Sequence, residues 1–282
     1  MASFNPTRGT VTNESCPLNY WSLGTSGPLI LFVPGGNGHG RQFNPMLAAL
    51  SARGYTCATF DRRQMSSSQP AADKRVMLSP PQQARDIRAV ITALGFSKAI
   101  IFGSSSGAIF SLQFAHDFPE MVEHVISHEA PLTNLLPAPA SSMMFDRFWR
   151  LIEMYRAGET EQAQREFASG LIGYADEGIP KTLSPEPGNS VNFWKYEMPT
   201  LAGYMPNLWR LVDNKTSVGV MRAVRSKDAF FALAVDELAK VLSCPNMMVP
   251  GHHQGFEVET ELFVPSFLEM LEILEKKRAD TT

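Results

Sequence analysis

One stretch near the middle of the chain constrains the fold more than any other. A run of apolar, strand-forming residues leads into Gly-x-Ser-x-Gly, and a helical pattern follows at once, in the sequence Ala99-Ile100-Ile101-Phe102-Gly103-Ser104-Ser105-Ser106-Gly107-Ala108. So tight a turn leaves room only for small residues, which Gly103 and Gly107 supply. The spacing selects Ser105 as the exposed side chain and candidate nucleophile. The N–H of Ser106, at the start of the helix, would then stabilise a developing oxyanion.

The pattern alone is weak evidence, because glycine- and serine-rich chains contain it by chance. The plain alternative is a Ser/Gly turn that joins a strand to a helix. The context favours a function: a buried strand precedes the turn, a helix with Ile109, Leu112 and Ala115 on one face follows it, and acids and histidines come later.

A glycine-rich loop offers a second oxyanion donor. The continuously apolar residues 28–33 predict a strand buried on both faces, and they end in Pro34-Gly35-Gly36-Asn37-Gly38-His39-Gly40. In a fold with such an elbow, the loop after this strand donates the second N–H to the oxyanion, and we assign that donor to Gly36. The alternative is a merely flexible glycine loop.

Apolar periodicity predicts an alternation of strands and helices around these motifs. Strands are expected at 19–23, 28–33, 56–60, 99–104, 122–129, 218–224 and 246–249. Helices are expected at 43–53, from 80 onward with Ser79 as its cap, after the elbow, and at 143–155, 160–171, 230–242 and 261–277. This order predicts an α/β fold with a mostly parallel sheet and helices on both faces.

The alternation is interrupted between the fifth and sixth of these strands. No strong strand pattern appears from 132 to 216, and residues 178–206 read as irregular and rich in proline. We therefore predict a helical lid at 133–216, inserted into a core formed by residues 1–132 and 217–282.

A serine nucleophile requires a base, and the base requires a carboxylate to fix its tautomer. The chain order for such an elbow is nucleophile, acid, histidine. His252 and His253 follow the last strand, where the base is expected, and either could serve. Glu129, at a strand end beside a proline break, is favoured as the acid, with Asp228 as the alternative. The paired histidines lack a third ligand at a suitable spacing, so we expect no metal.

These motifs resemble the α/β-hydrolase superfamily over nearly the full chain, and within it the zearalenone-lactonase group and related bacterial hydrolases. The resemblance is carried by Val33-Pro34-Gly35-Gly36-Asn37-Gly38, Asp61-Arg62-Arg63, Ser104-Ser105-Ser106-Gly107-Ala108, His128-Glu129-Ala130-Pro131 and Pro250-Gly251-His252-His253. It implies an α/β-hydrolase fold with Ser105, Glu129 and His253 as catalytic residues and with Gly36 and Ser106 as oxyanion donors.

The sequence also departs from that group at two places. Pro34-Gly35 replaces the His-Gly that many members have before the oxyanion loop, and Gln64 stands where a glycine usually follows the Asp-Arg-Arg run. Neither position belongs to the expected triad, so both departures concern the substrate.

Charge and composition exclude several classes of partner. The net charge is −3, which argues against nucleic acid or an anionic membrane, and no apolar run approaches the length of a membrane span. The 3 scattered cysteines form neither a disulfide framework nor a metal motif, and the N-terminus lacks a signal pattern. We expect a cytoplasmic protein without a cofactor, its oligomeric state open, with a homodimer as one option.

The expected lid is rich in large apolar side chains. It holds Trp149, Trp194 and Trp209 together with several methionines, which adapt to irregular apolar shapes. Many of these must pack the lid onto the core, and we assign Trp149 and Trp194 to an apolar substrate pocket above Ser105.

The sequence thus predicts a serine hydrolase that cleaves an ester or lactone of a mostly apolar small molecule. Three alternatives are a carbon–carbon bond hydrolase, a non-hydrolytic cyclase or acyltransferase, and a ligand receptor built on a hydrolase frame.

Overall fold

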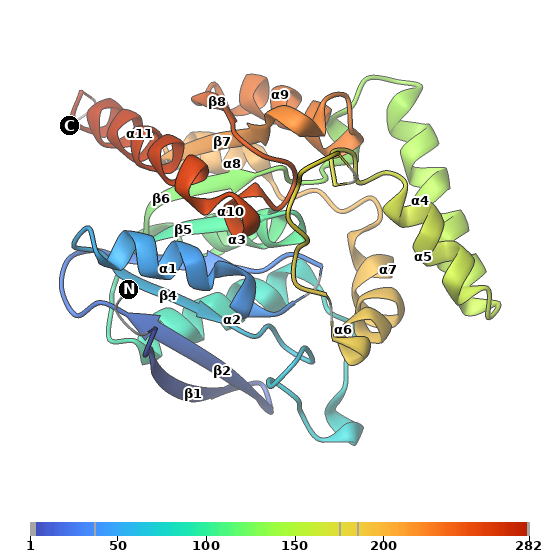
Figure 1. Ribbon diagram of the computed structural model, residues 1–282, viewed down its shortest axis with the longest axis horizontal. Helices are drawn as coiled ribbons and strands as arrows, with labels where there is room; N and C mark the ends of the chain where they lie inside the picture. The colour runs from blue at the N-terminus through green and yellow to red at the C-terminus, as the bar shows by residue number, and fades with distance from the viewer. Residues whose placement is uncertain (1–3, 37, 175, 185, 281–282) are drawn as a thin grey trace.

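A single twisted sheet runs through the molecule, with helices on both of its faces (Figure 1). The computed structural model describes residues 4–36, 38–174, 176–184 and 186–280. Within these ranges the sheet has 8 strands in the order β1-β2-β4-β3-β5-β6-β7-β8. The strands are β1 (Thr7–Asn13), β2 (Cys16–Leu23), β3 (Leu29–Val33), β4 (Thr56–Phe60), β5 (Ala99–Ser104), β6 (Val122–His128), β7 (Val218–Ala223) and β8 (Asn246–Val249).

Strands β4, β3, β5, β6, β7 and β8 run parallel, and the hairpin of β1 and β2 adds an antiparallel edge. The strands β3, β4 and β5 are buried at every position. Continuous apolar runs of this kind are typical of strands covered on both faces, which confirms the predicted α/β class.

Two apolar layers cover the sheet. Residues of α2, α3, α8 and α9 form one layer, and residues of α1, α10 and α11 form the other. These helices are α1 (Asn44–Ser51), α2 (Pro80–Ala93), α3 (Ser106–Asp117), α8 (Leu208–Asp213), α9 (Phe230–Leu242), α10 (Gly255–Val258) and α11 (Thr260–Ala279). The described helices include none that is long and apolar enough to cross a membrane.

The chain that follows Glu129 and leads to β7, here named the β6–β7 segment (residues 130–217), carries a small core of its own. Figure 1 shows its helices gathered at one end of the sheet, except α8, which packs on a face of the sheet. They are α4 (Ala140–Arg156), α5 (Thr160–Ala168), α6 (Pro187–Asn192), the π-helical turn η5 (Phe193–Glu197) and α7 (Met198–Leu201), followed by α8. Although α8 lies within the range predicted as lid, Leu208 and Leu211 pack into the core of the sheet domain.

The structure differs from the sequence predictions in three local features. Residues 187–201 are helical rather than irregular, because Pro187 and Pro199 lie in the first turns of α6 and α7, where proline is tolerated. Strand β1 was not predicted, since its polar sequence is only partly buried at the sheet edge. Ser79 is the N-cap residue of α2, but its side chain makes no capping hydrogen bond.

Candidate active site

The turn between β5 and α3 holds Ser105 in a strained conformation. Its φ is 58° and its ψ is −129°, a combination that L residues rarely adopt and that recurs at functional turns. The Ser105 N–H donates to the carbonyl of His128 at the end of β6, at 3.0 Å. A Cβ on Gly103 would lie 2.3 Å from the Gly107 carbonyl oxygen, so this close approach requires the flanking glycines.

Glu129 lies at the carboxyl end of β6, buried and with a φ of 48°. Its Oε1 accepts a hydrogen bond from the N–H of Ala223 at 2.8 Å, and its Oε2 accepts one from the Ser226 hydroxyl at 3.1 Å. Oε2 also lies 2.7 Å from Nδ1 of His253. Burial by itself raises the pKa of Glu129, but the hydrogen bond from His253 and the neighbouring imidazoles outweigh it and hold the pKa below its ordinary value.

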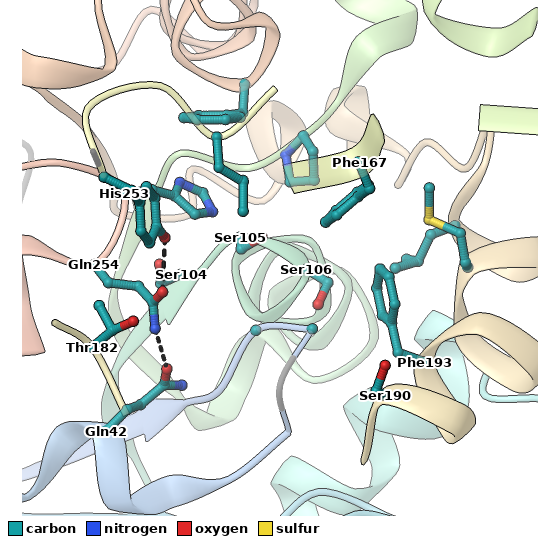
Figure 2. A pocket seen from close by; sticks show the side chains of 18 of the residues that line it. Gln42, Ser104, Ser105, Ser106, Phe167, Thr182, Ser190, Phe193, His253 and Gln254 are labelled. Atoms are coloured by element: carbon teal, nitrogen blue, oxygen red, sulfur yellow. Dashed lines mark hydrogen bonds between the residues drawn. The ribbon is translucent and has the colours of Figure 1, made fainter. Parts of the chain in front are cut away.

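The bond to Glu129 fixes the tautomer of His253. A carboxylate can only accept, so Nδ1 carries the proton and Nε2 keeps a free lone pair. In Figure 2 the imidazole of His253 is turned toward Ser105, and both residues line one cavity. The ring of Phe231 packs against the imidazole with 4.2 Å between the centroids, which restrains the histidine.

The other candidates for base and acid lie elsewhere. His252 stacks on Tyr174 with 4.2 Å between the ring centroids, and its Nδ1 accepts from the N–H of Gln254 at 3.0 Å. Burial lowers the pKa of His252. Asp228 is exposed between β7 and α9. Of the two candidate acids and the two candidate bases, the structure therefore brings Glu129 and His253 together.

The two predicted oxyanion donors face the same cavity. Gly36, in the loop after β3, and Ser106, at the first turn of α3, are both lining residues. The loop is closed by the Gly38 N–H, which donates to the Gly35 carbonyl at 2.8 Å. Asn37, which belongs to the motif of this loop, lies outside the described residues.

The cavity has a volume of about 450 Å³ and a largely apolar wall. The β6–β7 segment supplies much of this wall, through Phe148, Phe167, Phe193, Trp194, Met198 and Leu201. On the opposite side, Tyr174 donates from its hydroxyl to Oε1 of Gln254 at 2.8 Å, and Gln254 donates to Oε1 of Gln42 at 3.4 Å. Figure 2 shows these glutamines beside Thr182.

One of the two predicted pocket tryptophans lines the cavity and the other does not. Trp194 is a lining residue, and it stacks on Tyr155 with 5.2 Å between the ring centroids. Among the described lining residues, α4 contributes Phe148 and not Trp149. Consecutive helical residues point about 100° apart, so when Phe148 faces the cavity Trp149 is turned away from it, where it contacts Phe145 and packs against the core of the segment. Trp149 is therefore not among the described residues that line the cavity.

Sequence reasoning missed a buried ion pair beside the glycine-rich loop after β3. Arg62 donates from Nη1 to Oε2 of Glu197 at 2.7 Å and from Nη2 to Oε1 at 3.1 Å, and both side chains are 0% exposed. Burial raises the pKa of the Glu197 carboxyl, and the charge and hydrogen bonds of Arg62 oppose that rise. The Asp-Arg-Arg run was the available signal, but the partner lies 135 positions away.

Gln64, the other unusual residue of that run, has a φ of 64°. This conformation explains why a glycine is the usual choice here. Its side-chain Oε1 accepts a hydrogen bond from the N–H of Val76 at 2.7 Å.

The only group of side chains found in the described ranges that could hold a metal ion is Glu123, His124 and Glu275. None of the three lines the cavity.

A parallel sheet with a serine elbow after β5, an acid after β6 and a histidine after the last strand, β8, is the architecture of an α/β hydrolase. The chain belongs to this family, because residues 28–171 match the family described as alpha/beta hydrolase fold. Over 277 residues it is 28% identical to the uncharacterized hydrolase YraK of Bacillus subtilis, which spans 94% of this chain and 96% of that protein.

Three other comparisons are informative. A zearalenone hydrolase of Cladophialophora bantiana is 31% identical over 128 residues, 45% of this chain and 48% of that protein. A carboxylesterase structure from Nitrososphaera gargenis superposes with a TM-score of 0.69 at 14% identity, covering 96% of this chain and 100% of the other. Rv0554 of Mycobacterium tuberculosis gives 0.68 at 20% identity, covering 91% and 93%. The two structural likenesses show the fold.

Proposed function

We propose that the protein is a cofactor-independent serine hydrolase that cleaves an ester or lactone of a mostly apolar small molecule. The observation that carries this proposal is the 2.7 Å contact between Glu129 and His253, whose imidazole lines the same cavity as Ser105 on its strained turn. A serine hydroxyl becomes a nucleophile when a neutral imidazole oriented by a carboxylate accepts its proton.

The first half of the reaction forms an acyl-enzyme. Nε2 of His253 takes the hydroxyl proton while Oγ of Ser105 attacks the carbonyl carbon. The N–H groups of Gly36 and Ser106 hold the oxyanion, and Glu129 stabilises the imidazolium. The tetrahedral intermediate collapses when the ester oxygen takes the proton from His253 and its bond to carbon breaks.

The second half restores the enzyme. His253 deprotonates a water molecule, which attacks the acyl carbon, and the imidazolium then returns a proton to Ser105 as the carboxylic acid leaves. With an ester, the alcohol departs before this step. With a lactone, the hydroxyl and acyl ends belong to one chain, so the product is a single hydroxy acid.

The cavity wall supports an apolar substrate. Aromatic and aliphatic side chains of the β6–β7 segment face Ser105 across a cavity of about 450 Å³, within the range of small-molecule sites. The name of the zearalenone hydrolase relative, matched over 45% of this chain, also favours hydrolysis as the reaction.

Steady-state hydrolysis of p-nitrophenyl esters of increasing acyl length, alongside simple γ- and δ-lactones, tests the proposal. We expect turnover of at least one series by wild type, loss of that turnover in Ser105→Ala, and no change when EDTA is added. Binding of these compounds without turnover would instead favour a ligand receptor on the hydrolase frame. Loss of activity in EDTA that zinc restores would contradict the metal-free mechanism.

A further inference from the structure

The π-helical turn η5 reaches from the β6–β7 segment to both oxyanion donors. At its first residue, the ring of Phe193 lies so close to Gly36 that a Cβ added there would be 3.0 Å from the ring. At its last residue, Oε1 of Glu197 accepts a hydrogen bond from the Ser106 hydroxyl at 3.0 Å. Departures from regular α-helix of this kind often occur at functional sites.

Arg62 joins Glu197 to the other donor-bearing loop. Its Nη2 donates to the Gly35 carbonyl at 2.7 Å as well as to Glu197, and its backbone N–H donates to the Gly38 carbonyl at 3.0 Å. A chain of direct hydrogen bonds therefore runs from the loop that contains Gly36, through Arg62 and Glu197, to the first turn of α3.

Stability alone does not account for this arrangement. Two charges buried at 0% exposure lose their hydration, and a packed apolar pair of similar volume is often equally stable. A carboxylate beside an oxyanion hole would also repel the developing negative charge unless a cation neutralises it. Arg62 supplies that cation and, at the same time, holds the loop.

We propose that Glu197 is a positioning residue. Through Arg62 and the Ser106 hydroxyl it sets the separation of the Gly36 and Ser106 N–H groups, so that the oxyanion hole is complete only when η5 is seated on the sheet domain. This inference rests on the serine-hydrolase function proposed above.

The chain offers a matched control one residue away. Arg63 and Asp86 form a second buried ion pair, with 2.6 Å between Nη2 and Oδ1 and side-chain exposures of 1% and 0%. Arg63 also donates to the carbonyls of Asn13 and Glu14 at the turn between β1 and β2. Neither Arg63 nor Asp86 lines the cavity, so this pair serves stability without touching the oxyanion donors.

The test compares Glu197→Gln with Asp86→Asn on matched ester and thionoester substrates. An amide offers one acceptor oxygen where the carboxylate offers two, so Arg62 loses a partner in Glu197→Gln. Sulfur accepts hydrogen bonds weakly, so a thionoester depends less on the oxyanion hole. We expect Glu197→Gln to lower kcat for the ester roughly 10- to 100-fold with KM within about threefold, and to lower kcat for the thionoester far less.

For Asp86→Asn we expect a lower Tm and an unchanged ester-to-thionoester ratio. An equal loss of both activities in Glu197→Gln, or a shift of the ratio in Asp86→Asn, would overturn the positioning role.

Ser106→Ala keeps the backbone donor and removes only the hydroxyl, so it can replace Glu197→Gln in this test if that variant folds poorly. We expect it to lower the ester-to-thionoester ratio by about threefold to tenfold. An unchanged ratio in Ser106→Ala would overturn the inference. Failure of wild type to hydrolyse any ester would instead remove the proposed function, so the two failures are distinguishable.

Discussion

The carboxyl edge of the sheet and the β6–β7 segment hold their side chains in different ways. At the sheet edge, backbone hydrogen bonds fix the candidate catalytic residues: the Ser105 N–H donates to the His128 carbonyl at 3.0 Å, and the Glu129 N–H donates to the Met221 carbonyl at 3.0 Å. The segment packs around its own small core. It meets the sheet domain through the apolar side chains of α8 and through polar contacts, such as those of Glu197 with Arg62 and of Leu183 with Glu257.

This difference separates chemistry from selectivity. Strand ends joined to a parallel ladder have little freedom, so they suit groups whose geometry the reaction demands. A segment with its own core can change its inner wall without moving those groups. We therefore expect changes at the sheet edge to alter kcat for every substrate. Within the segment, Glu197 is tied to the sheet edge, and we expect changes in the side chains that line the cavity to alter which substrate is preferred.

The largest effect is expected at Ser105. Ser105→Ala should lower kcat by about 10⁴-fold or more, because the reaction loses its nucleophile. Thermal unfolding should stay close to wild type, since alanine fits a turn built for small residues. Residual activity within tenfold of wild type would show that the sheet edge does not carry the chemistry.

The second-largest effect is expected at the candidate acid Glu129, and Asp228 provides the control. Glu129→Gln should lower kcat by on the order of 10³- to 10⁴-fold, because an amide cannot stabilise the imidazolium or fix its tautomer in the same way. Asp228→Asn should stay within about tenfold of wild type, since Asp228 is exposed. Kinetics of both variants on one substrate decide between them, and the reverse ranking would move the acid to Asp228.

A smaller effect is expected in the segment, where Trp194 and Trp149 form a matched pair. Trp194→Phe should change the ranking of acyl chain lengths by about tenfold in kcat/KM, because Trp194 lines the cavity. Trp149→Phe should leave the ranking unchanged. A ranking that shifts equally in both variants, or only in Trp149→Phe, would break the proposed division between chemistry and selectivity.

The smallest effect concerns the contact between the two regions at Glu257. Burial raises the pKa of Glu257 from the ordinary 4.5 to about 7, although the Leu183 N–H and the Gln254 side chain donate to its carboxylate. The folded state thus binds this proton more tightly than the unfolded chain, so its stabilising effect is full below pH 4.5 and is lost as the pH rises toward 7.

Glu257→Gln removes this titration. The Tm of wild type relative to the variant should therefore fall by about 5 °C between pH 5 and pH 8. Calorimetry of both proteins across that range provides the measurement, and parallel Tm profiles would contradict the assignment.

Most of the sheet was predictable, because apolar runs such as 28–33 and 99–104 leave few alternatives to buried parallel strands. The position of Ser105 was predictable for a local reason: its two glycines are needed within five residues of each other. Glu129 and His253 were candidates by chain order, with Asp228 and His252 left as alternatives that only their positions in space separate.

The segment was less predictable because its contacts join distant parts of the chain. The sequence marks Arg62 by its neighbours but does not reveal Glu197, 135 positions later. The size of Trp149 also suggested a pocket residue, whereas Phe148 is the residue of α4 that faces the cavity. The prolines near η5 suggested irregular structure, yet they occupy first turns of helices.

The central claim is that Ser105 is the nucleophile, and covalent labelling tests it most directly. Wild-type protein treated with a fluorophosphonate probe should gain one adduct by intact mass, and peptide mapping should place it on Ser105. Glu129→Gln should label much more slowly, because its His253 is a poorer base. An adduct on Ser104 or Ser106, or undiminished labelling of Ser105→Ala, would contradict the account.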